Sequence, residues 1–148
     1  MVAPCYDAPA ERGHADGFRN GAYIVEDAYG ARRAGDWEKL ASYWRPDATF
    51  RLAGNPALIP AVPAAEAPAS ESVAALVRMF EFHDMERLGA VIDGNIAVFR
   101  WQVELSKPGE APIVTEILDW FELDDDGRIR SLVQFVDTAQ IARMTEGS

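Results

Sequence analysis

Apolar residues recur at helical spacing in two segments of the first third of the chain. Residues 18–34 have an apolar stripe with intervals of three and four positions, formed by Ala22, Ile24 or Val25, Ala28 and Tyr29. This period predicts an amphipathic helix. A shorter helix is expected after Gly35-Asp36, because glycine suits the end of one helix and aspartate the start of the next. Its apolar face is formed by Trp37, Leu40, Ala41 and Trp44, and Pro46-Asp47 is expected to end it.

Strand and helix signals alternate along the rest of the chain. Residues 48–52 have the period of two that predicts a first strand. A third helix is expected to start at Ser70 or Ser72, with a buried stripe formed by Val73, Leu76, Val77 and Phe80. Three strands should follow, the first from Asp93-Gly94 to Leu105, the others at 113–123 and 129–137, separated by turns at 107–110 and 124–127. A last short helix is expected at 138–144.

Two segments have no periodic pattern. Residues 1–17 mix proline, glycine and charged residues, and we expect a flexible N-terminal arm there. Residues 53–69 contain four prolines, which forbid a long helix or a central strand, so a long loop is expected. This loop either forms a lid over a pocket or packs on the body of the domain or on a partner subunit. Residues 18–148 should otherwise form a single domain.

The order of these elements predicts an α+β fold, with helices gathered on one face of an antiparallel meander. Strand alternation divides the side chains between two faces. The inward face should include Ala97, Phe99, Trp101, Val103, Leu105, Thr115, Ile117, Asp119, Phe121, Leu123, Leu132, Gln134 and Val136. The outer face should include Leu118, Trp120, Val133 and Phe135. Large apolar side chains are costly to leave in water, so this outer set predicts a homodimer.

Charge and composition exclude several classes of function. The chain has 148 residues, a formal net charge of -10 and a single cysteine, Cys5. Such an acidic chain without a basic patch is not expected to bind nucleic acid. Neither a membrane-spanning stretch nor a signal peptide is expected, which predicts a cytoplasmic protein. The acidic run at 124–127 lacks the spacing of a calcium loop, and no motif for a metal or a cofactor is present.

Several stretches of the sequence resemble the nuclear transport factor 2-like superfamily. They are the run Ala34-Gly-Asp-Trp-Glu-Lys-Leu, then Pro46-Asp-Ala-Thr-Phe, Leu118-Asp-Trp-Phe, Asp126-Gly-Arg-Ile and Phe135-Val-Asp. The superfamily includes ketosteroid isomerases, SnoaL-type polyketide cyclases, limonene epoxide hydrolases and scytalone dehydratases. The resemblance implies a cone-shaped half-barrel, in which a curved, mostly antiparallel sheet holds three helices on its concave face around an apolar pocket. It also implies pairing through the outer face of the sheet.

Asp119 is the leading catalytic candidate. Alternation directs it into apolar surroundings, where desolvation should raise the pKa of its carboxyl. A neutral acid donates a hydrogen bond or a proton to a developing oxyanion. By resemblance, Asp119 matches the oxyanion-hole aspartate of ketosteroid isomerases, which are a known example of a carboxylic acid kept neutral. The other reading is that Asp119 binds a buried backbone group or an arginine.

The remaining catalytic positions of these relatives are changed. The ketosteroid isomerase base corresponds to Leu52-Ala53 and the tyrosine of its first helix to Ala28. The Asp-Arg-Asp set of the epoxide hydrolases corresponds to Arg100, Gln102 and Gln134, in which both acids are amides. The tyrosine-aspartate pair of scytalone dehydratase falls on Arg32-Arg33. None of these three reactions is therefore expected in its usual form.

Two further residues could assist Asp119. His83 has a pKa range suited to acid-base work, although a histidine beside Asp84 at a helix end is commonly a surface or capping residue. Tyr29 could donate from the first helix. The expected ligand walls and polar contacts are Trp44, Trp101, Phe99, Phe121, Phe80, Tyr43 and Gln134.

Three functions remain open. The first is a cofactor-independent isomerase, cyclase or lyase that acts on a small, mostly apolar carbonyl compound. The second is a dimeric module that binds an apolar ligand without turning it over. The third is a dimerisation domain whose interior is filled by side chains.

Overall fold

The structure, a computed structural model of the chain, describes residues 24–31, 34, 36–54 and 68–146. Residues 24–31 are helical. The elements after them are α2 (Trp37–Ser42), β1 (Trp44–Leu52), α3 (Ala69–Met79), β2 (Glu81–Asp93), β3 (Ile96–Ser106), β4 (Ile113–Leu123), β5 (Ile129–Val136) and α4 (Thr138–Thr145). The predicted arm at 1–17 and most of the predicted loop at 53–69 lie outside the described residues.

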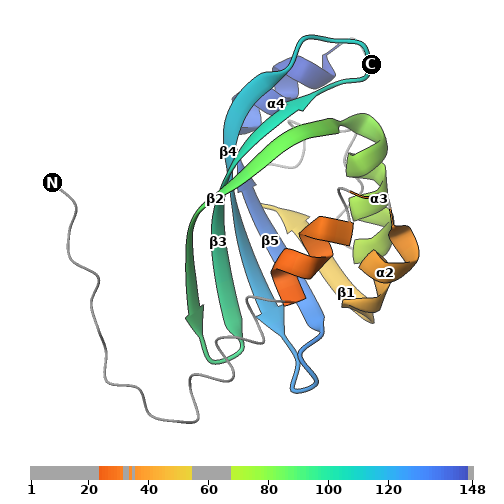
Figure 1. The fold of residues 1–148 in the computed structure, drawn as a ribbon, viewed down its shortest axis with the longest axis vertical. Coiled ribbons are helices and arrows are strands. Elements are labelled where there is room, and N and C mark those ends of the chain that lie inside the picture. Colours follow the sequence, from red (N-terminus) through yellow and green to blue (C-terminus); the bar gives the residue numbers. More distant parts are fainter. Residues whose placement is uncertain (1–23, 32–33, 35, 55–67, 147–148) are drawn as a thin grey trace, which may run out of the picture.

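The five strands form one sheet in the order β1-β5-β4-β3-β2. β2 to β5 pair antiparallel with their neighbours, whereas β1 pairs parallel with β5. The chain therefore goes from one edge of the sheet to the other between β1 and β2, and α3 lies on that connection (Figure 1). The predicted α+β fold with a mostly antiparallel sheet is confirmed.

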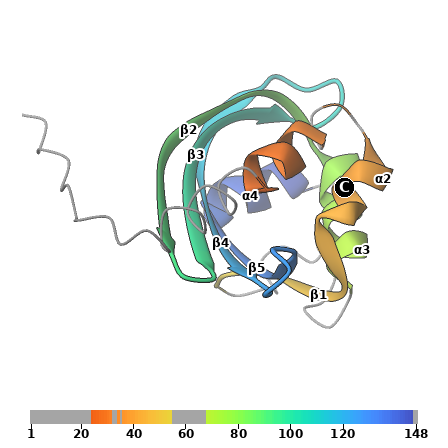
Figure 2. The ribbon, with the colours of Figure 1, turned by 60° about the horizontal axis from the view of Figure 1, so that its bottom comes forward.

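The sheet curves strongly and encloses a space on its concave side. Seen from its end, it bends around the helical segment 24–31, and α2 and α3 lie across the open side (Figure 2). Register shifts occur in β2 beside Phe82 and Arg87, and a further shift occurs between β4 and β5. An extra residue on one strand bends the sheet and increases its twist, which explains part of the curvature.

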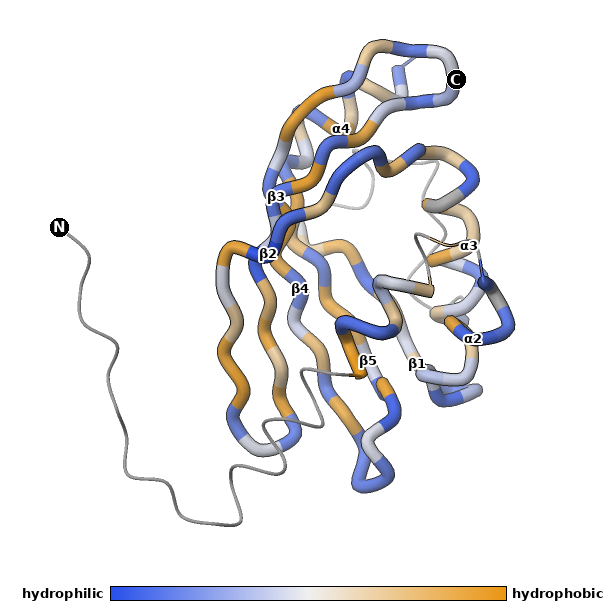
Figure 3. The backbone as a smooth tube through the Cα atoms, in the orientation of Figure 1, coloured by the Kyte–Doolittle hydropathy of each residue, from blue (hydrophilic) through white to orange (hydrophobic). Residues whose placement is uncertain are grey.

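Alternation in β3 and β4 directs one set of side chains into this space. Hydrophobic and hydrophilic positions alternate along both strands (Figure 3). The predicted inward residues of β3 and β4 are all buried: Ala97, Phe99, Trp101, Val103, Leu105, Thr115, Ile117, Asp119, Phe121 and Leu123. The predicted outer residues Trp120 and Phe135 are 41% and 48% exposed. The predicted facing of these strands is therefore confirmed.

The first strand begins earlier than predicted. Helix α2 ends at Ser42, and Trp44 lies in β1, as do Pro46 and Asp47, which were expected to end the helix. Trp44 pairs with Ile129 of β5, before the register shift that precedes Thr49. Proline is compatible with an edge strand, because one side of that strand needs no backbone donor.

An entire strand was absent from the prediction. β2 covers Glu81–Asp93, so Asp93 is the last residue of this strand and Gly94 lies in the turn between β2 and β3, rather than both starting the meander. His83 therefore lies in a strand and not at a helix end. The predicted hairpin turns at 107–110 and 124–127 are present, and Gly109 and Gly127 have φ angles of +79° and +80°.

The start of α3 also differs from the prediction. Pro68 occupies the cap position and no side chain caps the helix, so neither Ser70 nor Ser72 has that role. Ser72 is instead fully buried one turn into the helix. Within the described residues, no helix combines the length and the apolar content that crossing a membrane requires.

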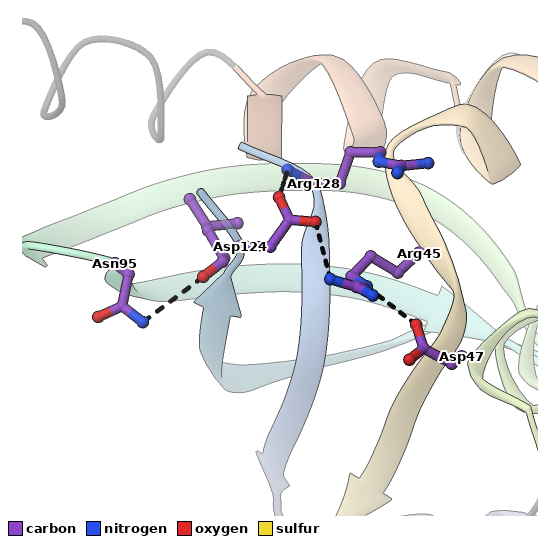
Figure 4. A network of polar contacts seen from close by, with 6 residues as sticks. Arg45, Asp47, Asn95, Asp124 and Arg128 are labelled. Atoms are coloured by element: carbon purple, nitrogen blue, oxygen red, sulfur yellow. Dashed lines mark hydrogen bonds and ion pairs between the residues drawn. The ribbon is translucent and has the colours of Figure 1, made fainter. Parts of the chain in front are cut away.

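A polar network joins β1 to the turn between β4 and β5 (Figure 4). The guanidinium of Arg45 donates to Asp47 at 2.9 Å and to Asp124 at 3.4 Å. Asp124 also accepts the backbone N–H of Arg128 at 2.8 Å. The hydrogen bond from Arg45, together with its charge, lowers the pKa of Asp47. The network therefore links the edge strand β1 to the turn that joins the neighbouring strands β4 and β5.

Candidate functional site

Asp119 lies at the centre of the concave face. On β4 it is paired with Phe99 of β3 and with Gln134 of β5. Its side chain is completely buried, and its Oδ1 accepts a hydrogen bond of 2.8 Å from Nε2 of Gln134. Gln134 is itself buried. Two predicted site residues on neighbouring strands are thus brought into direct contact.

The surroundings of Asp119 favour the neutral acid. Burial raises the pKa of its carboxyl from 3.8 to about 7, and the hydrogen bond from Gln134 acts in the opposite direction. Taking a carboxylate out of water is costly, and one amide hydrogen bond replaces only part of its hydration. No described residue makes an ion pair with Asp119. The carboxyl of Asp119 therefore keeps its proton at pH values where an ordinary aspartate has lost it.

Aromatic side chains surround this position. The rings of Tyr29 and Trp101 are 4.5 Å apart, and those of Phe99 and Trp101 are stacked at 5.8 Å. Phe121 meets the rings of Tyr29 and Phe99 edge-on, at 6.5 and 6.2 Å. Helix 24–31, β3 and β4 thus each contribute to one apolar cluster, which excludes water from the carboxyl.

Two buried polar atoms of this face have no hydrogen-bond partner within the described part of the chain. They are Oδ2 of Asp119 and Nε1 of Trp101. Trp101 pairs with Ile117, and Asp119 pairs with Phe99, so the two side chains occupy diagonal positions on adjacent strands. Such neighbours lie about 7–8 Å apart at the backbone, within the reach of an indole. Buried polar groups normally have partners, so these two atoms are exceptional within the described part of the face.

The interior cavity next to Gln134 is small, and neither Asp119 nor Trp101 lines it. Its volume is about 30 Å³. That is room for about one water molecule, so side chains fill most of the interior. The cavity wall is formed by Ala28, Tyr29, Leu40, Trp44, Phe50, Val73, Leu76, Phe121, Ile129, Leu132 and Gln134. Gln134 thus connects the cavity to Asp119.

His83 is placed far from Asp119. It lies at the register shift of β2, and its Nε2 is 2.8 Å from the hydroxyl of the buried Ser106. Along β3, the position of this pair is about 20 Å from Phe99, the residue opposite Asp119. Ser106 was not singled out from the sequence, because nothing in the pattern signalled the pairing of β2 with the end of β3.

The other predicted ligand residues belong to the hydrophobic core or pack against it. Trp44 is nearly buried in β1 and borders the cavity, whereas Phe80 is buried at the end of α3. Tyr43 is half-buried, and its backbone carbonyl accepts from Ile129. Of the residues that the structure describes, no group of three histidine, cysteine, aspartate or glutamate side chains could hold a metal ion.

Comparison with known proteins supports a specific family and fold. A family model, the SnoaL-like domain, matches residues 25–132. An NTF2-like protein of unknown function from Burkholderia pseudomallei has a TM-score of 0.71 at 15% identity, with 86% of this chain and 98% of that chain covered. An LEH-like epoxide hydrolase from M. tuberculosis has a TM-score of 0.66 at 17% identity, covering 84% and 88%.

A third solved structure has a ligand in its description. TerC, co-crystallised with polyporic acid, has a TM-score of 0.69 at 14% identity, with 86% of this chain and 99% of that chain covered. At such identities, the similarity of all three structures shows the fold alone. No curated protein matches the sequence.

Proposed function

The chain belongs to the SnoaL-like domain family, and from this premise we propose that it binds a small, mostly apolar carbonyl compound beside Asp119 and acts on it as a cofactor-independent isomerase, cyclase or lyase. The observation that supports this proposal most directly is that Oδ2 of the buried Asp119 has no hydrogen-bond partner among the residues that the structure describes. A structural carboxyl would be expected to have both oxygens satisfied.

The hydrogen bond from Gln134 determines where the acidic proton resides. Because Oδ1 accepts from Nε2 of Gln134, the proton of the neutral acid belongs on Oδ2. An O–H at Oδ2 would donate to the carbonyl oxygen of a ligand, and it would stabilise the negative charge that develops on this oxygen as an enolate or alkoxide forms. In an interior without water, such a hydrogen bond is stronger than at the surface.

Trp101 supplies the second donor in this proposal. Its Nε1 is buried without a partner among the described residues, on the position diagonal to Asp119. Two donors directed at one oxygen are the basic requirement of an oxyanion hole. Tyr29 and Phe121 would hold the apolar part of the ligand through ring contacts. His83 has no role here, given its distance from Asp119.

The small cavity favours a second candidate, a dimeric domain without turnover. A volume of about 30 Å³ is far below the roughly 300–1,000 Å³ of typical ligand sites. If side chains do not move, the interior serves only to fill the fold. The two candidates therefore differ in whether the wall of the cavity opens for a ligand.

We also propose that the chain forms a homodimer through the outer face of its sheet. Leu118 pairs with Phe135 and Trp120 with Val133, so these four side chains form one apolar patch across β4 and β5. Trp120 and Phe135 remain 41% and 48% exposed in the single chain. A second copy covering this patch would remove it from water.

The test of the proposed site is an NMR titration of the Asp119 carboxyl, with and without small aromatic ketones. A pKa near 7 that changes when a ketone binds is the expected result, because a hydrogen bond to the ligand oxygen stabilises the neutral acid. Asp119→Asn keeps an acceptor for Gln134 but removes the acidic proton, so it should retain binding and lose turnover. A pKa near 3.8 that no ketone changes would exclude the acid role and leave the domain without turnover.

A further inference from the structure

We infer that a groove between α2 and α3 is the outer half of the ligand site and that it selects compounds with an anionic group at one end. This inference rests on the proposed function, since it concerns the route to the interior and the class of substrate. The groove has a volume of about 410 Å³, against about 30 Å³ for the interior cavity. It is the larger space by more than tenfold, and its size suits a small organic molecule.

The wall of the groove is apolar along most of its length. On α3 it is formed by Ser70, Val73, Ala74 and Arg78, which share one side of the helix at intervals of three and four residues. On the opposite side it is formed by Leu40, Ala41 and Trp44. Figures 1 and 2 both show α2 beside α3 at the open side of the curved sheet.

Three residues belong to both spaces. Leu40, Trp44 and Val73 line the groove on one side and the interior cavity on the other. They are therefore the partition between the groove and the residues around Gln134. Trp44 lies in β1 just after α2, before the shift in the β1–β5 register. In this inference, a rotation of the Trp44 side chain opens the partition between the two spaces.

Charge supports an anionic ligand end. The whole chain has 24 acidic and 14 basic residues. Among the described residues that line the groove, however, none is acidic and Arg78 is the only charged one. Arg78 is exposed, and no ion pair joins it to another described residue. A guanidinium at the end of an apolar groove is a donor for carboxylate, sulfonate or enolate oxygens.

The dimensions of α3 limit the length of the ligand. Ser70 and Arg78 are eight positions apart, which corresponds to about 12 Å along the helix axis. An amphiphile of two rings with an acid at one end spans this distance. The acid would meet Arg78, while the rings would lie against Ala74 and the partition formed by Leu40, Trp44 and Val73.

A basic residue in the last turn of a helix has another explanation, because it interacts favourably with the helix dipole. The chain provides a matched control for this effect. Arg143 is an exposed arginine in the last turn of α4, and it does not line the groove. Arg78→Gln and Arg143→Gln change the net charge and the helix end in the same way, but only the first changes the groove.

The experiment compares a neutral and an anionic probe of nearly the same shape, N-phenylnaphthylamine and anilinonaphthalene sulfonate, by fluorescence titration at low salt. Arg78→Gln should weaken binding of the sulfonate probe by about fivefold, which is the range expected for a partly exposed ion pair. Binding of the neutral probe should not change. Arg143→Gln should change neither. Ala41→Trp should fill the groove and displace both probes, and Ala74→Trp repeats this test from the opposite wall. Circular dichroism confirms that each variant is folded.

The outcomes separate this inference from the proposed function. An equal loss of affinity for the sulfonate probe in the Arg78→Gln and Arg143→Gln variants would overturn the proposed selectivity for anions. Unchanged binding of the neutral probe in folded Ala41→Trp and Ala74→Trp would overturn the groove as a binding site, while the titration of Asp119 would still test the interior. Conversely, an Asp119 with an ordinary pKa in a chain whose groove passes both tests would remove the proposed catalysis and leave the groove as a binding site for anions.

Discussion

At the scale of single residues, burying the carboxyl of Asp119 costs the folded protein free energy. A leucine at this inward position would bury apolar surface, whereas a carboxyl must be either desolvated or protonated. The position of the aspartate could be predicted from strand alternation, because the side chains of β4 alternate without a bulge from Ile113 to Glu122. Its hydrogen bond to Gln134 could not, since that contact depends on the register across the hairpin from β4 to β5.

The raised pKa of Asp119 gives the stability of the protein a specific pH dependence. The folded state binds this proton more tightly than the unfolded state. Its contribution is therefore fully present below pH 3.8 and is lost as the pH rises through about 7. The loss is on the order of 4 kcal/mol. We predict that the free energy of unfolding falls over this window, which urea denaturation at a series of pH values would measure.

Asp119→Asn is the control for this prediction. An asparagine keeps an oxygen for the hydrogen bond from Gln134, but its amide has no proton to lose. The variant should lack the decrease between pH 4 and 7 and should be more stable than the wild type at pH 8. Parallel stability curves for the two proteins would show that Asp119 titrates normally.

At the scale of elements, the central strands could be predicted and the edge strands could not. β3 and β4 each bury one face, which imposes the period of two on their sequence. β2 is an edge strand in which most residues are exposed, and two register shifts interrupt its alternation. Because most of its side chains face water, β2 needs no alternation of apolar and polar residues. Its sequence therefore lacks the period of two that predicts a strand. The start of β1 was missed because Trp44 continues the helical spacing of Trp37, Leu40 and Ala41 in α2.

The hairpin between β4 and β5 offers a prediction at this scale. Gly127 has a φ of +80°, and a methyl group added there would lie 3.1 Å from Cδ1 of Ile24 in the helical segment 24–31. Gly127→Ala should destabilise the protein by about 1–2 kcal/mol through the left-handed backbone, with a further few tenths from the displaced isoleucine. Thermal or urea unfolding measures the total.

Gly109→Ala separates the two contributions. Gly109 has nearly the same φ, +79°, but an added methyl group would meet nothing within 4 Å. Its variant should show the backbone cost alone. If Gly109→Ala cost as much as Gly127→Ala, the contact between the hairpin and Ile24 would have no energetic weight.

At the scale of the whole molecule, the sheet has a concave face around Asp119 and a convex face with unpaired apolar residues. The proposed dimer covers the convex face. We predict that Trp120→Glu and Phe135→Glu each yield monomers in analytical ultracentrifugation, because a carboxylate cannot be buried without a partner. The concave face should be unaffected, so the pKa of Asp119 should not change.

Val114→Glu is the matched control for the dimer. Val114 is 59% exposed and also lies on the outer face of β4, but it is four residues from Leu118. The Val114→Glu substitution adds the same charge outside the patch of Leu118, Trp120, Val133 and Phe135. It should therefore leave the dimer intact. A chain that is already monomeric before any substitution would refute the proposed pairing.

The parallel pairing of β1 with β5 has a consequence for how the chain is made. β1 ends at Leu52, yet β5, the strand with which it pairs, begins at Ile129, more than half the chain away. The hairpins of β2 to β5 join neighbouring segments and can form as soon as these segments are synthesised, whereas contacts so distant in sequence form slowly. During translation, β1 can pair in the sheet only after β5 has been synthesised, when most of the chain has left the ribosome. Because Trp44 lies in β1, the partition between the groove and the interior should form among the last events of folding.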